Sequence, residues 1–580
     1  MAVWMRLRYL LLATPFLVFG AADSISIIAN GLVCEFDAQC RTNFCSPGPS
    51  EKQFCTVAPD QCGVPGEDGV SLESFYRFEG ALYGCETGPH LRRLGTAASS
   101  WADDIKPAWQ EEIKAIRVAQ MRRSLAAGDT FPALYNTQYQ SMNFLVRARM
   151  EMDIAILSDL SEIALIPLAY LYNAEAVRQD TPTRASDITT AVTWQDKSPQ
   201  SARLDNLNNI VQWHFFTSYL INSIVKIDYT QRSAAMNSVV DLYSKLFSFT
   251  LYEMVFNADN AFGWDFRGWS GCHKAGILGH REITQKKRHR KMDHLADAPC
   301  NAILDWDIQL WASVLEYVAA AATDPARVHY FTDQKKHSQL KDYLRLAFAT
   351  VDTHHTETTV TDFDGNPTTG LIFDQGAWAT HLDYKYAQSN SAYPPSDPDA
   401  PGPTDEIGED VSHHIRYTWV LLSFFDNKSL LGTDFPDSAD MSKFARQLAY
   451  TVFTKNFQRP QFNNFMDGSN GWFRVYPGPG GTVDKGPYGS GNIGIIYSGL
   501  GFYQPFVPEI RNILDSVALA YTHTSGVFGD RARQALDTGV WKNCTYSVEQ
   551  TRWQQCEPYA GYLGFKSYHA ESLAFRSQNY

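Results

Sequence analysis

The chain has 580 residues, 44% of them hydrophobic, and carries a formal charge of −13 at pH 7. This length exceeds what one simple core supports, unless the architecture is a closed repeat of helices or a barrel. The acidic balance argues against a protein that wraps a polyanion, because nucleic-acid binding draws on an excess of Lys and Arg. We therefore expect no nucleic-acid partner.

The first 22 residues have the order of a secretory signal peptide. Arg6 and Arg8 precede an apolar run, 9–19, and the small residues 20–22 follow it. The apolar run is shorter than the roughly 20 residues that span a bilayer, which disfavours the alternative of a transmembrane anchor. We expect cleavage near Asp23, a secreted mature protein, and no membrane span after removal of the signal.

All ten cysteines lie beyond this signal, and the even count suits the oxidising secretory pathway. Six crowd into residues 23–89, and four form two distant local pairs. The simplest expectation is three bridges inside the module and one in each later pair; its pattern stays open, because six cysteines allow 15 connectivities. A zinc site is disfavoured, since no CxxC pair occurs. The cysteines expected to form disulfides are Cys34, Cys40, Cys45, Cys55, Cys62, Cys85, Cys272, Cys300, Cys544 and Cys556.

Composition divides the remainder into two parts. Residues 23–89 are rich in Gly, Pro, Ser and Cys without a sustained helical period, which predicts a small module of loops held by disulfides. From residue 100 to 580 apolar residues recur at helical spacing, which predicts a mainly α body. Helices are expected over 101–126, 141–178, 204–227, 234–256, 302–322, 338–355, 411–425, 441–456 and 508–522. Two glycosylation sequons, at Asn427 and Asn543, predict surface asparagines.

Long aromatic segments, 363–403 and 458–503, separate the later helices, and long ordered loops on a rigid scaffold are where sites tend to be built. The most informative motif lies between them, at 408–419. Asp410 or Ser412 can cap a helix there. Spacings of three and four then gather a carboxylate, imidazoles and a phenol at the helix start, where a carboxylate orients a histidine for proton transfer. The alternative is that Asp410 is only a cap and the histidines fill a polar interface.

Two aromatic stretches add groups that suit a sugar ring. Residues 462–476 interleave Asn, Asp and Arg with aromatic rings, which offers flat faces for stacking and planar polar groups for hydroxyls or carboxylates. A tightly turned structural loop is the alternative, because Gly and Asn also make turns. Residues 373–386 precede the Asp410 helix. The candidates for substrate binding are Trp378, His381, Asp383, Arg416, Asn463, Asn464, Asp467, Trp472 and Arg474.

Helices with Asp, His and Tyr at a helix start, aromatic loops and a secretory signal resemble the (α/α)-toroid polysaccharide lyases of the alginate-lyase and heparinase type. The resemblance covers about residues 100–524 in architecture and includes no complete family signature. It implies a toroid-like helical body that cleaves a uronic-acid-containing glycan by β-elimination, with no cofactor. A His or Tyr would take the proton, an Asn, Gln or Arg would neutralise the carboxylate, and a Tyr would protonate the leaving oxygen. The implied catalytic residues are Asp410, His413, His414, Tyr417 and Tyr384.

Two other functions remain open. A glycoside hydrolase on the same scaffold would need two carboxylates, Glu409 or Asp410 with Asp383 or Asp467. A secreted glycan-binding or virulence protein would use the same aromatic loops without turnover. The sequence contains no HExxH, GxSxG or GxxxxGK[ST] motif, which disfavours zincin, α/β-hydrolase and nucleotide-dependent enzymes.

Overall fold

The computed structural model describes the chain in segments. These are residues 106, 109–110, 114–170, 207–256, 281, 284–285, 303–328, 334–373, 384–389, 407–457, 461–475, 483–489 and 499–514, with short strands near both ends. The chain divides into two compact units, 1–99 and 100–580. The predicted signal, most of the cysteines and the sequon at Asn543 lie outside the described residues.

The described strands of the first unit form two small antiparallel sheets. In one, β3 (Gln53–Cys55) pairs with β1 (Val33–Cys34) and with β2 (Cys45–Pro47). In the other, β5 (Ala81–Cys85) lies between β4 (Phe75–Phe78) and β6 (Leu91–Arg93). The sequence predicted loops here and overlooked these strands, which are too short to show an alternating pattern.

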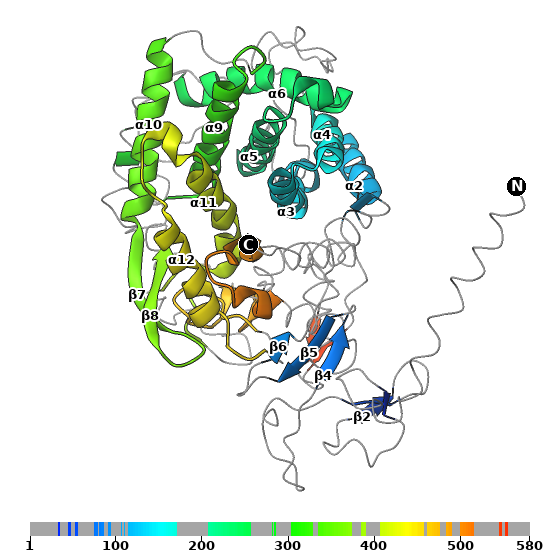
Figure 1. The fold of residues 1–580 in the computed structure, drawn as a ribbon, viewed down its shortest axis with the longest axis vertical. Coiled ribbons are helices and arrows are strands. Elements are labelled where there is room, and N and C mark those ends of the chain that lie inside the picture. The colour runs from blue at the N-terminus through cyan, green and yellow to red at the C-terminus, as the bar shows by residue number, and fades with distance from the viewer. Residues whose placement is uncertain are drawn as a thin grey trace, which may run out of the picture. The chain divides into compact units, whose positions relative to one another are not determined.

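The second unit is mainly helical in its described part, which confirms the predicted class (Figure 1). The predicted helix over 141–178 is two helices, because Met152 adopts a left-handed conformation and Asp153 caps the next helix by accepting from Ala155 and Ile156. The helices are α2 (Lys114–Ala127), α3 (Asn136–Glu151), α4 (Ile154–Leu168), α5 (Leu207–Ile224), α6 (Ala234–Leu251), α9 (Asp305–Thr323), α10 (Gln334–Thr353), α11 (Val411–Leu431) and α12 (Ser438–Gln447). None of these described helices is long and apolar enough to cross a membrane.

Consecutive helices alternate between two rows. Contacts run from α3 to α5, from α5 to α9 and from α9 to α11, which makes an inner row, while α4 and α6 contact each other outside it (Figure 1). α9 is buried along nearly its whole length, from Asp307 to Ala321, as expected of an inner helix. Gln138 at the start of α3 donates to Gln309 at 2.8 Å, and Arg149 near its end donates to Glu316 further along α9, so these two helices run in the same direction.

A β-hairpin interrupts the helices between α10 and α11. β7 (His355–Thr361) and β8 (Pro367–Phe373) are antiparallel, and β8 packs against α12. Asp362 closes the turn by accepting from the backbone of Asp364 and Asn366. The sequence predicted part of this segment as a long loop. Further short antiparallel pairs are β9 (Phe473–Val475) with β10 (Val483–Lys485) and β11 (Thr545–Ser547) with β12 (Arg552–Gln554).

The expectation that Asn427 lies on the surface is wrong. Its side chain is buried in α11, where the amide nitrogen donates to Glu316 Oε1 at 2.9 Å and to the Ser423 carbonyl at 2.8 Å. A glycan on this nitrogen would replace one of its two N–H donors and leave a buried acceptor without its partner, which costs about 1–3 kcal/mol before any clash.

We therefore expect Asn427 to be unmodified in the folded protein, even from a host that attaches glycans. Intact-peptide mass spectrometry checks this directly. Asn427→Asp should destabilise the fold by about 3 kcal/mol, because it brings a second carboxylate against Glu316. Ser429→Ala is the matched control: it removes the same sequon at an exposed position and should change neither glycan occupancy nor stability. Occupancy at Asn427 in folded material would contradict the burial.

Candidate active site at the helix starts

Asp410 is the N-cap of α11 and is fully buried. Its Oδ1 accepts from the backbone N–H of His413 at 3.1 Å, as a capping carboxylate does, and from the Ser412 hydroxyl. Its Oδ2 accepts from the Tyr384 hydroxyl at 2.7 Å and contacts Nδ1 of His413. Burial opposes ionisation of Asp410, but His413 and the donated hydrogen bonds outweigh it and hold the pKa of this carboxyl well below its ordinary value.

His413 is therefore held by one ring nitrogen, and its side chain remains partly exposed. Nδ1 faces the buried carboxylate of Asp410, while the side chain as a whole keeps 23% of its surface exposed. On the far side, Nε2 lies 3.9 Å from Oδ2 of Asp305. Phe473 meets the imidazole edge-on, with ring centroids 5.9 Å apart, and limits its rotation. A histidine with one nitrogen fixed by a carboxylate has the arrangement of a general base.

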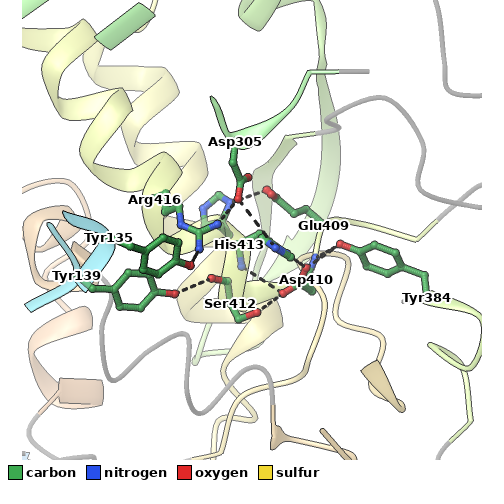
Figure 2. Close-up of polar contacts among 10 residues, drawn as sticks. Tyr135, Tyr139, Asp305, Tyr384, Glu409, Asp410, Ser412, His413 and Arg416 are labelled. Atoms are coloured by element: carbon green, nitrogen blue, oxygen red, sulfur yellow. Dashed lines mark hydrogen bonds and ion pairs between the residues drawn. The ribbon is translucent and has the colours of Figure 1, made fainter. Parts of the chain in front are cut away.

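Asp305 and Arg416 complete the polar cluster (Figure 2). Asp305 is the first residue of α9, and its carboxylate, 16% exposed, accepts from Nη1 of Arg416. Arg416 lies on the turn of α11 that follows His413, and its Nη2 contacts the hydroxyl of Tyr135. The cluster thus joins the start of α9, the start of α11 and the turn that precedes α3.

Two tyrosines form an aromatic wall beside Arg416. Tyr135 ends the π-helical turn η6 (Phe131–Tyr135), and Tyr139 follows it in the first turn of α3. Their rings stack with centroids 5.4 Å apart, and the guanidinium lies 5.0 Å and 5.5 Å from the two ring centres. Such cation–π contacts favour a charged Arg416 in this cluster.

His414 lies away from this cluster although it follows His413 in sequence. Adjacent residues on a helix point about 100° apart, and His414 is buried with its Nδ1 3.7 Å from Oε2 of Glu409. Burial lowers the pKa of His414 to about 3. Glu409 is also buried, and its backbone carbonyl accepts from Met466 at 2.9 Å. His414 is therefore placed as a neutral residue of the interior.

The contacts of Tyr417 and Tyr384 do not suit either residue to act as a proton donor. The Tyr417 hydroxyl lies 2.5 Å from Nε2 of His355, and its ring stacks on Phe373 with centroids 4.0 Å apart. Tyr384 is buried and directs its hydroxyl to Asp410. Burial raises the pKa of both phenols well above the ordinary value. Tyr417 is a core residue here, and Tyr384 orients Asp410.

Buried neutral histidines make the fold acid-sensitive. Burial lowers the pKa of His214 and His414 to about 3, whereas an unfolded histidine titrates near 6.5. Between these values the unfolded chain binds protons that the folded chain does not, so stability falls as pH falls. In the middle of that window, we expect the two residues together to lower the free energy of unfolding by about 2.7 kcal/mol for each unit that the pH falls. Urea midpoints measured from pH 7 to pH 4 test this. His414→Gln should lower the slope by about 1.4 kcal/mol per pH unit, and an unchanged slope would contradict its burial as the neutral form.

The loop over 461–475 has mainly structural contacts, the alternative that the sequence left open. Asn464 donates its amide to the carbonyls of Gly471 and Gly486, and Asn463 donates to Thr451. Asp467 accepts from Ser469. These side chains hold the turn, and the backbone of Asn464 in turn accepts from Val411 at the start of α11.

The remaining candidates divide between buried and undescribed positions. Trp472 is buried against Gly486, so its ring faces do not meet solvent. Trp378, His381 and Asp383 lie outside the described residues, as does the side chain of Arg474. Of the predicted set, the structure brings together Asp410, His413, Arg416 and Tyr384.

Sequence reasoning missed Asp305, Tyr135 and Tyr139. Each lies at the start of another helix, more than 100 residues before Arg416 in sequence, and no local motif links them to it. The available signal was the acidic first turn of α9, which contains Asp305 and Asp307. Among the described residues, no group of three His, Cys, Asp or Glu side chains is arranged to hold a metal ion.

Comparison with models of protein families, with curated proteins and with solved structures finds no match to this chain.

Proposed function

We propose that residues 100–580 form a carbohydrate-active enzyme, most consistent with a polysaccharide lyase that uses His413 as its base. The observation that carries the proposal is the Asp410–His413 pair: one ring nitrogen contacts a buried carboxylate, and the imidazole remains partly exposed beside Asp305. A base that is oriented on one side and accessible on the other is what proton abstraction requires.

Architecture supports the same proposal. Helices alternate between an inner and an outer row, and the starts of α3, α9 and α11 meet at the site. An alternation of this kind is expected of a toroid-like body of paired helices, and it supports the proposal. The positive dipole ends of these helices favour negative charge that develops on a substrate.

In β-elimination, Nε2 of His413 would remove the proton next to the uronate carboxylate, while Nδ1 keeps its hydrogen bond to Asp410. The electron pair forms the new double bond and expels the glycosidic oxygen. Arg416, which is buried and paired with Asp305, would have to turn toward the substrate to neutralise the carboxylate. Tyr135, whose hydroxyl contacts Arg416, is the candidate that protonates the leaving oxygen.

Hydrolysis is the second candidate, and Asp305 favours it. This carboxylate is partly exposed and already occupies Arg416, so a uronate would have to compete for the guanidinium. The carboxylate pairs predicted from the sequence are less suitable, because Glu409 and Asp410 are buried and Asp467 accepts a hydrogen bond from Ser469. A hydrolase would therefore use Asp305 with a second acid.

The test is incubation of the purified mature chain with uronic-acid and neutral polysaccharides, following ultraviolet absorbance and new reducing ends together. An elimination creates an unsaturated, absorbing product and a reducing end, whereas hydrolysis creates only the reducing end. Absorbance that depends on His413 supports the lyase. Reducing ends alone support the hydrolase. Saturable binding without either product would overturn both in favour of a glycan-binding protein.

A further inference from the structure

A second polar cluster lies deep among the inner helices, away from the proposed site. Its centre is Glu316 of α9, which is completely buried. Oε1 accepts from the Ser423 hydroxyl at 2.7 Å and from the Asn427 amide at 2.9 Å; Oε2 accepts from Arg149 Nη1 at 3.0 Å and from the Asn222 amide at 2.5 Å. One carboxylate thus binds side chains of α3, α5 and α11 at once.

All four donors are also buried. Asn222 and Ser423 have no exposed surface, and Arg149 places its guanidinium 4.3 Å from the ring centre of Tyr219. Burial opposes the charge of Arg149, but Glu316 outweighs it and holds the pKa of the guanidinium above its ordinary value. A buried charge network of this kind adds little net stability compared with apolar packing, whereas it can fix the register of helices.

The spacing along each helix relates this cluster to the site. Asp305 precedes Glu316 by eleven residues on α9, His413 precedes Ser423 by ten on α11, and Tyr139 precedes Arg149 by ten on α3. At 1.5 Å per residue these separations are about 15–17 Å on all three helices. The site and the Glu316 cluster are therefore two levels across the same parallel helices, and an axial slip at one level displaces the other.

We infer that Glu316 is a positioning residue: through its four hydrogen bonds it sets the axial register of α3, α9 and α11, and so the separation of Asp305 from His413. This inference rests on the proposed function for its kinetic consequence and on geometry alone for its structural one. Apolar packing between the same helices would tolerate a shift of a fraction of a turn, while the four directional bonds do not.

The kinetic test uses Glu316→Gln, which keeps the size of the side chain. The substitution replaces one accepting oxygen with an N–H donor, which then faces other hydrogen-bond donors. A misplacement of about 1 Å can cost 100-fold in rate, so we expect kcat to fall about 10- to 100-fold per folded molecule with KM little changed. Combining it with Asn427→Asp restores the pattern, because the introduced glutamine amide can then donate to the new carboxylate. The double variant should recover kcat to within about threefold.

Met236→Ala is the control for lost stability: Met236 is buried on the outer helix α6, and a cavity there should lower the urea midpoint of unfolding without touching the cluster. Its kcat per folded molecule should stay at the wild-type value. A crystal structure of Glu316→Gln supplies a readout that needs no activity: the distance from Asp305 Oδ2 to His413 Nε2, 3.9 Å here, should change. An unchanged distance, or a kcat no lower than that of Met236→Ala, would overturn the inference; absence of activity in the wild type would overturn only the proposed function.

Discussion

His413→Gln is expected to lower kcat/KM by a factor of about 10²–10⁴, the contribution of a positioned general base. The glutamine amide can still donate to Asp410, so the buried carboxylate is not left without a partner in the variant. The loss should therefore appear in kcat while the fold remains intact. Steady-state kinetics on the substrate that gives a product, with thermal unfolding alongside, measures both effects.

His414→Gln is the matched control, because it makes the same substitution one residue later on the same helix. His414 faces Glu409 in the interior, and its replacement keeps a donor toward that carboxylate. We expect kcat/KM within about threefold of wild type, with any cost confined to stability. Activity that survives in the His413 variant and is lost in the His414 variant would exchange their roles, and survival in both would remove histidine from the mechanism.

The helical class and the start of α11 could be predicted because both are local. Helical periodicity shows in a single segment, and an Asp followed three residues later by a His on the same helix face is visible without a structure. Asp410 and His413 do meet as that spacing predicts. The Asp305–Arg416 pair, by contrast, depends on how α9 lies beside α11, which a local pattern does not encode.

The same limit explains the candidates whose contacts lie elsewhere. Spacings of three and four predicted that Tyr417 shares a helix face with Asp410 and His413. However, α11 is an inner helix and has other elements packed around it. Its other faces therefore make interior contacts, and Tyr417 packs on Phe373. Asn427 satisfied a surface motif and yet is buried, because a sequon specifies only an Asn and a Ser or Thr two residues later and contains no information on the neighbouring helix that carries Glu316.

The turn-forming residues of the loop over 461–475 were ambiguous for a different reason. Asn and Gly serve a sugar site and a tight turn equally well. The groups that accept hydrogen bonds from the Asn side chains distinguish a sugar site from a tight turn. Here the amides of Asn463 and Asn464 donate to backbone carbonyls, as in a tight turn.

Asp410→Asn should lower kcat by about 10³–10⁴, because an asparagine oxygen can still cap α11 while its amide no longer accepts the proton of His413 Nδ1. Tyr384→Phe removes one donor to Asp410 and leaves the His413 contact, so its loss should be smaller, about tenfold. Asp437→Asn is the matched control, since Asp437 caps α12 through the backbone of Asp440 and contacts no described site residue.

The Asp410 variant also has a signature in stability. The pKa of Asp410 is lowered in the folded state, so its ionised form stabilises the fold above the ordinary value of about 4, and this contribution is lost as pH falls toward the lower folded-state value. Denaturant unfolding from pH 6 to pH 2 should show a shallower acid dependence in Asp410→Asn than in wild type. Equal slopes together with an unaffected kcat would mean that Asp410 only caps the helix, and the base would then have to be sought among the residues around Asp305.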